Sequence, residues 1–159
     1  MKGIDDLNDN GILYNIDLND ILLISNKTIK LTNYAHYYLF QNDNKCFNEV
    51  KCPEQLTSIN LYNEKSQVWL IGEIMIQLID GNKLNNTIDD FISIFKSGNT
   101  LKQQEYINNK IDIILNTFLH ITDDLKNIVK LCFQLNPLLR PSVKEVSIIF
   151  MINKLIITI

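Results

Sequence analysis

The chain has 159 residues and a formal net charge of -3, with 46% of its residues apolar and 21% charged. This length allows one domain with its own hydrophobic core. Nucleic-acid binding is not expected, because contacts to phosphates need clustered Lys and Arg side chains. A transmembrane segment is not expected either, because the apolar stretch 146–159 is interrupted by polar residues and is too short to cross a bilayer.

The cysteines and the N-terminus indicate the compartment. Cys46, Cys52 and Cys132 are odd in number and show no Cys-x-x-Cys spacing, so neither a disulfide framework nor a zinc site is expected. The first ten residues, MKGIDDLNDN, have acids where a signal peptide has bases and an apolar stretch. Both observations favour a cytoplasmic protein with reduced thiols.

Short runs typical of β-strands come first along the chain. Residues 11–14, 21–24 and 29–32 are such runs, and the turn 25–28 joins the last two as a hairpin. Residues 41–63 are polar and irregular, which predicts a loop.

The apolar pattern becomes helical from Lys65 onward. A helix is expected over Lys65–Ile79, buried on most sides because its apolar residues cover nearly the whole circumference. Further helices are expected over about residues 88–96 and 110–119, after the cap Thr122 and after the cap Ser142. Short β-hairpins followed by about five helices predict an α+β fold that is mainly α.

Five short motifs resemble those of protein kinases. NIDLNDILL is similar to the catalytic loop R-D-L-x-x-x-N-I-L-L, and KLTNYA is similar to the K-x-x-D-F-G that begins the activation segment. CPE is similar to A-P-E, SQVWLIG to S-D-V-W-S-x-G, and NPLLRPS to D-P-x-x-R-P-[ST]. In their order and spacing across about residues 11–150, they resemble the C-terminal lobe (C-lobe) of the protein-kinase fold.

The resemblance implies one partial kinase-like domain over residues 1–159. Residues 11–40 would be the catalytic-loop and D-F-G-like hairpin region, 41–63 the activation-segment-like loop and 64–159 the helical subdomain. Nothing resembles the Gly-rich loop or the V-A-I-K lysine of the N-terminal lobe, so that lobe is expected to be absent. No cofactor is therefore expected for this chain, and Mg-ATP is expected only if a longer parent protein retains binding.

The resemblance also implies residues with structural roles. Glu54, the acid of A-P-E, would pair with Arg140 of the late turn and tie the activation segment to the helical core. Gln67 stands where the family has an Asp that accepts hydrogen bonds from the catalytic loop, and its amide oxygen could accept one such bond without charge assistance. The other scaffold positions are Pro53, Trp69, Gly72 and Pro141.

The positions for catalysis and metal binding depart from the kinase pattern. Without gaps, the base position falls on Asn15, the metal-binding Asn position on Asp20 and the D-F-G Asp on Asn33. An amide cannot act as the base and is a poor ligand for Mg²⁺. A one-residue gap would instead put Tyr14-Asn15-Ile16 on the H-R-D triplet, which also lacks the carboxylate, and only a shifted loop would make Asp17 the base. Asp20 could retain one metal with Asn33 beside it, or be a solvated loop residue.

These departures favour a catalytically inactive, pseudokinase domain that acts as a protein-interaction or regulatory scaffold. Among pseudokinases, the chain resembles the kinase-like domain of TBC-domain-containing kinase-like proteins in the run GILY…ILLISNKTIKLTNYAHYYLF, in GNKL after the central helix and in the ending TDDLKNIVKLCFQLNPLLRPSVKEV. That resemblance would connect the chain with Rab- and TBC-related proteins of membrane traffic. The alternative is a fragment of an active or ATP-binding serine/threonine kinase that transfers the γ-phosphate of ATP to protein hydroxyls. An unrelated helical fold would instead leave Glu54 and Arg140 far apart.

Overall fold

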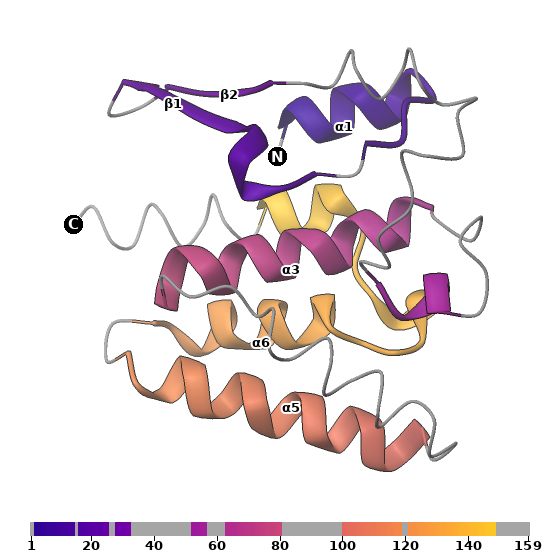
Figure 1. The fold of residues 1–159 in the computed structure, drawn as a ribbon, viewed down its shortest axis with the longest axis vertical. Helices are drawn as coiled ribbons and strands as arrows, with labels where there is room; N and C mark the ends of the chain where they lie inside the picture. The colour runs from indigo at the N-terminus through magenta and orange to yellow at the C-terminus, as the bar shows by residue number, and fades with distance from the viewer. Residues whose placement is uncertain are drawn as a thin grey trace.

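The computed structural model describes residues 2–14, 16–25, 28–32, 52–56, 63–80, 100–118 and 121–148. Among these residues, helix α6 (Asp123–Cys132) packs between α3 (Glu64–Asp80) and α5 (Thr100–Asn116). Figure 1 shows α1 (Lys2–Asp9) and the hairpin of β1 (Ile21–Ser25) and β2 (Thr28–Leu31) on the opposite side of α3 from α6. The predicted α+β class, mainly α, is confirmed.

Helix α1 differs from the strands and turns expected for the first 40 residues. Ile4 is buried and Leu7 packs against the core, so one face of the helix is apolar. The helix ends in two backbone bonds, from Gly11 N to Asn8 O at 2.9 Å and from Ile12 N to Leu7 O at 2.9 Å. Gly11 has a φ of 72°, the left-handed conformation that this helix ending requires.

The strand expected over residues 11–14 is therefore wrong. Gly11 belongs to the exit of α1, and residues 12–14 run on as irregular chain. A short continuous run of apolar residues does not by itself distinguish a strand from an apolar segment of another conformation.

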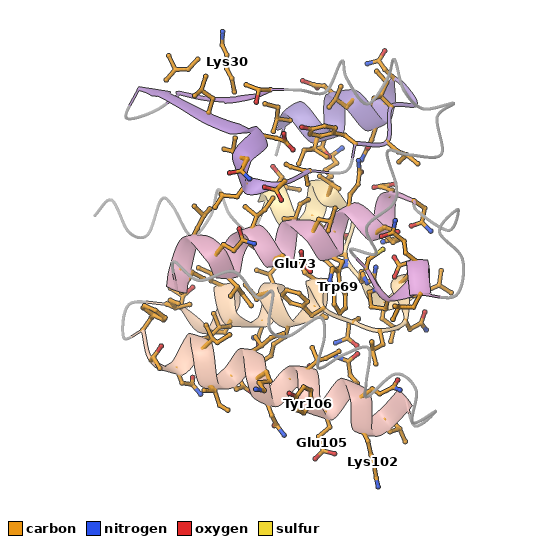
Figure 2. The ribbon with its side chains drawn as sticks, viewed as in Figure 1. Lys30, Trp69, Glu73, Lys102, Glu105 and Tyr106 are labelled. Carbon is orange, nitrogen blue, oxygen red and sulfur yellow. The ribbon has the colours of Figure 1, made fainter. Side chains whose placement is uncertain are left out.

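The hairpin expected from the turn at 25–28 is confirmed. β1 and β2 are antiparallel, with Ile21 opposite Leu31 and Leu22 opposite Lys30. Ile21 and Leu31 pack against the core, whereas Leu22 and Lys30 are exposed. Figure 2 shows Lys30 pointing away from the molecule. The alternation of the strand thus gives one apolar inner face and one outer face.

Helix α3 is the centre of the core, and the prediction for Lys65–Ile79 is confirmed with one further residue at each end. Asn63 caps it, because its Oδ1 accepts from the N–H groups of Lys65 at 2.8 Å and Ser66 at 3.2 Å. Its buried apolar side chains occupy most of the circumference: Val68, Trp69, Leu70, Ile71, Ile74, Met75 and Ile76.

Gly72 lets α3 and α6 approach closely. A Cβ atom at this position would lie 2.8 Å from Cβ of Cys132 and 2.9 Å from Cε2 of Phe133. Any larger residue would have to push α6 away, so the glycine of the motif SQVWLIG is required by helix packing.

Helix α5 begins ten residues earlier than the helix expected over 110–119, which is a correction. Its buried side chains recur every four residues as Gln103, Ile107, Ile111 and Leu115. Because the first of them is polar, the repeat of apolar residues begins only at Ile107, several residues after the helix itself begins. The helix expected over 88–96 lies outside the described residues.

The last predicted helices are confirmed. Thr122 caps α6 by accepting from the N–H of Leu125 at 3.3 Å. The helix of residues 143–148 starts with a capping box: Ser142 Oγ accepts from Glu145 N at 3.2 Å, and Glu145 Oε2 accepts from Ser142 N at 2.7 Å. Within the described ranges, no helix is both long and apolar enough to cross a membrane.

Candidate functional site

A buried ion pair joins two segments that are far apart in sequence. Glu54 lies in the short 3₁₀ helix η3 (Pro53–Leu56), and Arg140 follows η5 (Pro137–Leu139). Arg140 Nη1 donates to Glu54 Oε1 at 2.7 Å, and Nη2 donates to Oε2 at 2.8 Å. The side chains are 0% and 9% exposed. The structure thus contains the bidentate pair that the resemblance implies, and the two residues do not lie far apart.

Arg140 also binds the chain around it. Its Nε donates to Gln134 O at 2.7 Å and its Nη1 to Lys65 O at 2.8 Å. In return, Lys65 Nζ donates to Arg140 O at 2.7 Å. The guanidinium carbon lies 5.1 Å from the centre of the Trp69 ring, within the range of a cation–π contact. One side chain therefore joins η3, α3 and the turn before the last helix.

Glu54 remains charged in this site. Burial tends to raise the pKa of its carboxyl, but the hydrogen bonds and charge of Arg140 and the hydroxyl of Ser66, 2.7 Å away, bring the pKa below its ordinary value of 4.5. A buried charge with this many donors is satisfied, whereas the same charge without its partner is strongly destabilising.

The other scaffold residues surround the pair. Trp69, whose ring meets Phe133 edge to face at 4.9 Å, donates from Nε1 to Glu73 Oε1 at 2.9 Å. Figure 2 shows Trp69 and Glu73 on α3 within the layer of helices. Pro53 begins η3, and Pro141 separates Arg140 from the cap of the last helix.

The carboxylates of the catalytic-loop-like segment accept hydrogen bonds from backbone N–H groups of the same segment. Asp17 Oδ1 accepts from Asn19 N at 2.9 Å, and Asp20 Oδ2 accepts from Asp17 N at 2.9 Å. Together they form a capping box around the 3₁₀ helix η1 (Leu18–Asp20). Asp20 is only 9% exposed, so it is not the solvated residue considered above. The candidate base Asp17 and the candidate metal ligand Asp20 are thus brought together as a turn.

Asn15, at the base position, and Asn33, at the D-F-G Asp position, lie outside the described residues. Across the described ranges, no group of three or more His, Cys, Asp or Glu is arranged to hold a metal ion. Of the positions expected for Mg-ATP, only Asp20 is described, and one of its oxygens accepts from the backbone of Asp17. A single carboxylate in this arrangement does not form the ligand set of a nucleotide-bound Mg²⁺.

Gln67 corrects an expectation. Its amide was expected to accept a hydrogen bond from the loop, but its Nε2 donates to Tyr14 O at 3.0 Å. Its Oε1 is buried with no hydrogen-bond partner among the described atoms. Gln67 therefore contacts the catalytic-loop-like segment as expected, but as a donor and not as an acceptor, because the group that faces it is the carbonyl of Tyr14.

Tyr14 is a residue of this site that the sequence did not reveal. It is fully buried, and its hydroxyl donates to Thr32 O at 2.7 Å. Thr32 N in turn donates to Asp20 O at 2.8 Å. Tyr14 thus connects the loop to the end of β2 and, through Gln67, to α3. The sequence offered an aromatic residue in a short apolar run and, with the one-residue gap, the first position of the H-R-D triplet, and neither predicts these bonds.

The described cysteines are buried thiols. Burial raises the pKa values of both Cys52 and Cys132 to about 12. Both are free and remain protonated at neutral pH, so neither is a reactive nucleophile.

Comparison with known proteins gives a limited similarity. The chain is 26% identical over 93 residues to mitogen-activated protein kinase kinase kinase 3 of Arabidopsis thaliana. The match covers 58% of this chain and 14% of that protein. Neither a family model nor a solved structure matches the chain. Part of the chain is therefore similar in sequence to a protein kinase, while it spans only a small share of that kinase's length.

Proposed function

We propose that the chain is a kinase-like C-lobe domain that binds protein partners and does not transfer phosphate. The main support is the contrast between two sets of acids. Glu54 forms the buried pair with Arg140, whereas Asp17 and Asp20 cap a turn of their own backbone. A base must reach the hydroxyl of a substrate, and a metal ligand must face the phosphates. Acids that satisfy neighbouring N–H groups are suited to support a loop.

The helical core supports the proposed role as a scaffold. Arg140 joins three segments, and Gly72 allows α3 and α6 to pack closely. These contacts stabilise the fold without requiring nucleotide. Under this proposal the domain acts in the cytoplasm, and Rab- and TBC-related proteins of membrane traffic are the first partners to test, because the chain resembles TBC-domain-containing kinase-like proteins.

A second candidate is a segment of an active or ATP-binding serine/threonine kinase. The observation that favours it is the similarity to the Arabidopsis kinase over 93 residues. In that case Asp17 would be the base and Asp20 would retain a metal, both after a change in the capping turn. Nucleotide would then be bound with help from parts of a longer parent protein.

Phosphotransfer and nucleotide binding separate the two candidates. The purified chain, and the longest natural protein that contains it, are incubated with labelled Mg-ATP and a generic protein substrate. We expect the wild type to incorporate no more labelled phosphate into the substrate than the Asp17→Ala variant does. We also expect Mg-ATP to leave the melting temperatures of the wild type and of Asp20→Ala unchanged. Turnover that disappears with Asp17→Ala would exclude the proposed function and establish the second candidate.

A further inference from the structure

The backbone carbonyl of Tyr14 faces two donors. Gln67 Nε2 lies 3.0 Å from this oxygen, and Ile16 N donates to it at 3.0 Å as well. A carbonyl oxygen has two lone pairs and no proton, so both of its acceptor sites are used. Whatever side chain of α3 stands opposite this oxygen must therefore donate.

The amide of Gln67 contacts the loop through its nitrogen. Gln67 is fully buried, and its Oε1 has no hydrogen-bond partner among the described atoms. Its Nε2 donates to Tyr14 O. Exchanging this nitrogen for a charged oxygen would bring two acceptors together at about the same distance, in a place from which water is excluded.

We infer that Gln67 is a positioning residue whose donor group holds the described loop residues 12–14 and 16–20 against α3, and that a carboxylate at this position cannot hold them. The loop held in this way contains the Asp17–Asp20 capping turn, and through the Tyr14 hydroxyl it is joined to the end of β2. An acid placed at position 67 would release the segment instead of supporting it. The inference concerns the support of the loop, so it applies equally to a binding domain and to an enzyme.

Urea unfolding measured over a range of pH tests whether the side chain at position 67 must donate a hydrogen bond. The variants are Gln67→Glu, which can donate only when protonated, and Gln67→Met, which has a similar length and no donor at any pH. Asn109→Asp, an exposed position on α5, is the control for adding one charge. A buried carboxyl facing a carbonyl has a folded-state pKa above its unfolded value, so its stability relative to the wild type is highest at low pH.

We expect the unfolding constant of Gln67→Glu, relative to the wild type, to rise by up to about tenfold per pH unit between pH 5 and the raised pKa, because one proton is released on unfolding. The Gln67→Met difference should stay constant across the series, and Asn109→Asp should match the wild type. A Gln67→Glu difference that is the same at pH 5 and pH 9, or absent at pH 9, would overturn the inference.

Hydrogen exchange provides a second readout if Gln67→Glu does not fold. In Gln67→Met, the protection of amides in residues 12–20 should fall at least tenfold, while protection in residues 103–116 of α5 is unchanged. If residues 12–20 were as well protected in Gln67→Met as in the wild type, the amide would not hold the loop. Phosphotransfer is not measured in either experiment, so failure here is separate from failure of the proposed function.

Discussion

The surroundings of Arg140 and the loop of residues 12–20 both resemble kinase motifs, but they are stabilised in different ways. Around Arg140, the guanidinium forms an ion pair with the carboxylate of Glu54, and the Arg140 side chain is 0% exposed. In the loop, Asp17 and Asp20 cap neighbouring N–H groups, and α3 contributes the neutral amide of Gln67. In the first region the acid binds a partner distant in sequence, whereas in the second the acids bind backbone groups within a few residues and the distant contacts are neutral hydrogen bonds.

This difference shows which motif positions the fold itself requires. Replacing one member of a buried ion pair leaves a charge without a partner in a medium that solvates it poorly. Replacing a local cap removes a hydrogen bond to one backbone N–H, at a lower cost of about 0.5–2 kcal/mol. Under the proposed function, the fold would still require Glu54 and Arg140, whereas the acids of the loop could change.

The largest expected effect comes from Arg140→Met. The variant leaves the Glu54 carboxylate buried without its cation and should lose about 3–5 kcal/mol of unfolding free energy. Urea unfolding followed by circular dichroism measures the loss. The double variant Glu54→Leu/Arg140→Met is the matched control, and it should be clearly more stable than Arg140→Met because no unpaired charge remains. If the single and double variants were equally unstable, the pair would not be the source of the cost.

A smaller effect is expected in the pH dependence of the unfolding free energy, through the carboxyl of Glu54. The folded-state pKa of Glu54 lies below its ordinary value of 4.5, so the unfolded chain takes up this proton first as the pH falls. The stabilisation is thus fully present above pH 4.5 and is lost as the pH falls through the lower folded-state pKa. Unfolding free energies measured from pH 7 to pH 3 should fall less steeply for Glu54→Gln than for the wild type. Parallel curves would contradict a depressed pKa.

The smallest effect is expected in the loop, for Tyr14→Phe. This variant keeps the buried ring and removes the hydroxyl that donates to Thr32 O at 2.7 Å. A neutral hydrogen bond contributes about 0.5–1.5 kcal/mol net, so the loss should be well below that of Arg140→Met. Chemical denaturation of both variants under one buffer condition makes the comparison. A Tyr14→Phe loss as large as that of Arg140→Met would show that the loop is not the weaker region.

Features with a local cause were predictable from the sequence. The two strands on either side of the expected turn pair as a hairpin, Thr122 caps α6, and the apolar circumference of 65–79 forms a buried helix. Each depends on the conformational preferences of a few consecutive residues. The pairing of Glu54 with Arg140 is long-range, and it was accessible only because the motifs around both residues resemble those of one family.

Tertiary structure decided what consecutive residues leave open. The start of α5 at Thr100 depends on a polar residue, Gln103, being buried against the core. The polarity of Gln67 depends on which backbone atom of the loop faces α3, and the role of Tyr14 depends on where β2 ends. An amide can donate or accept, and an aromatic residue can pack or bond. The neighbour across the core selects between these possibilities, and neighbours that meet only on folding are not encoded in local pattern.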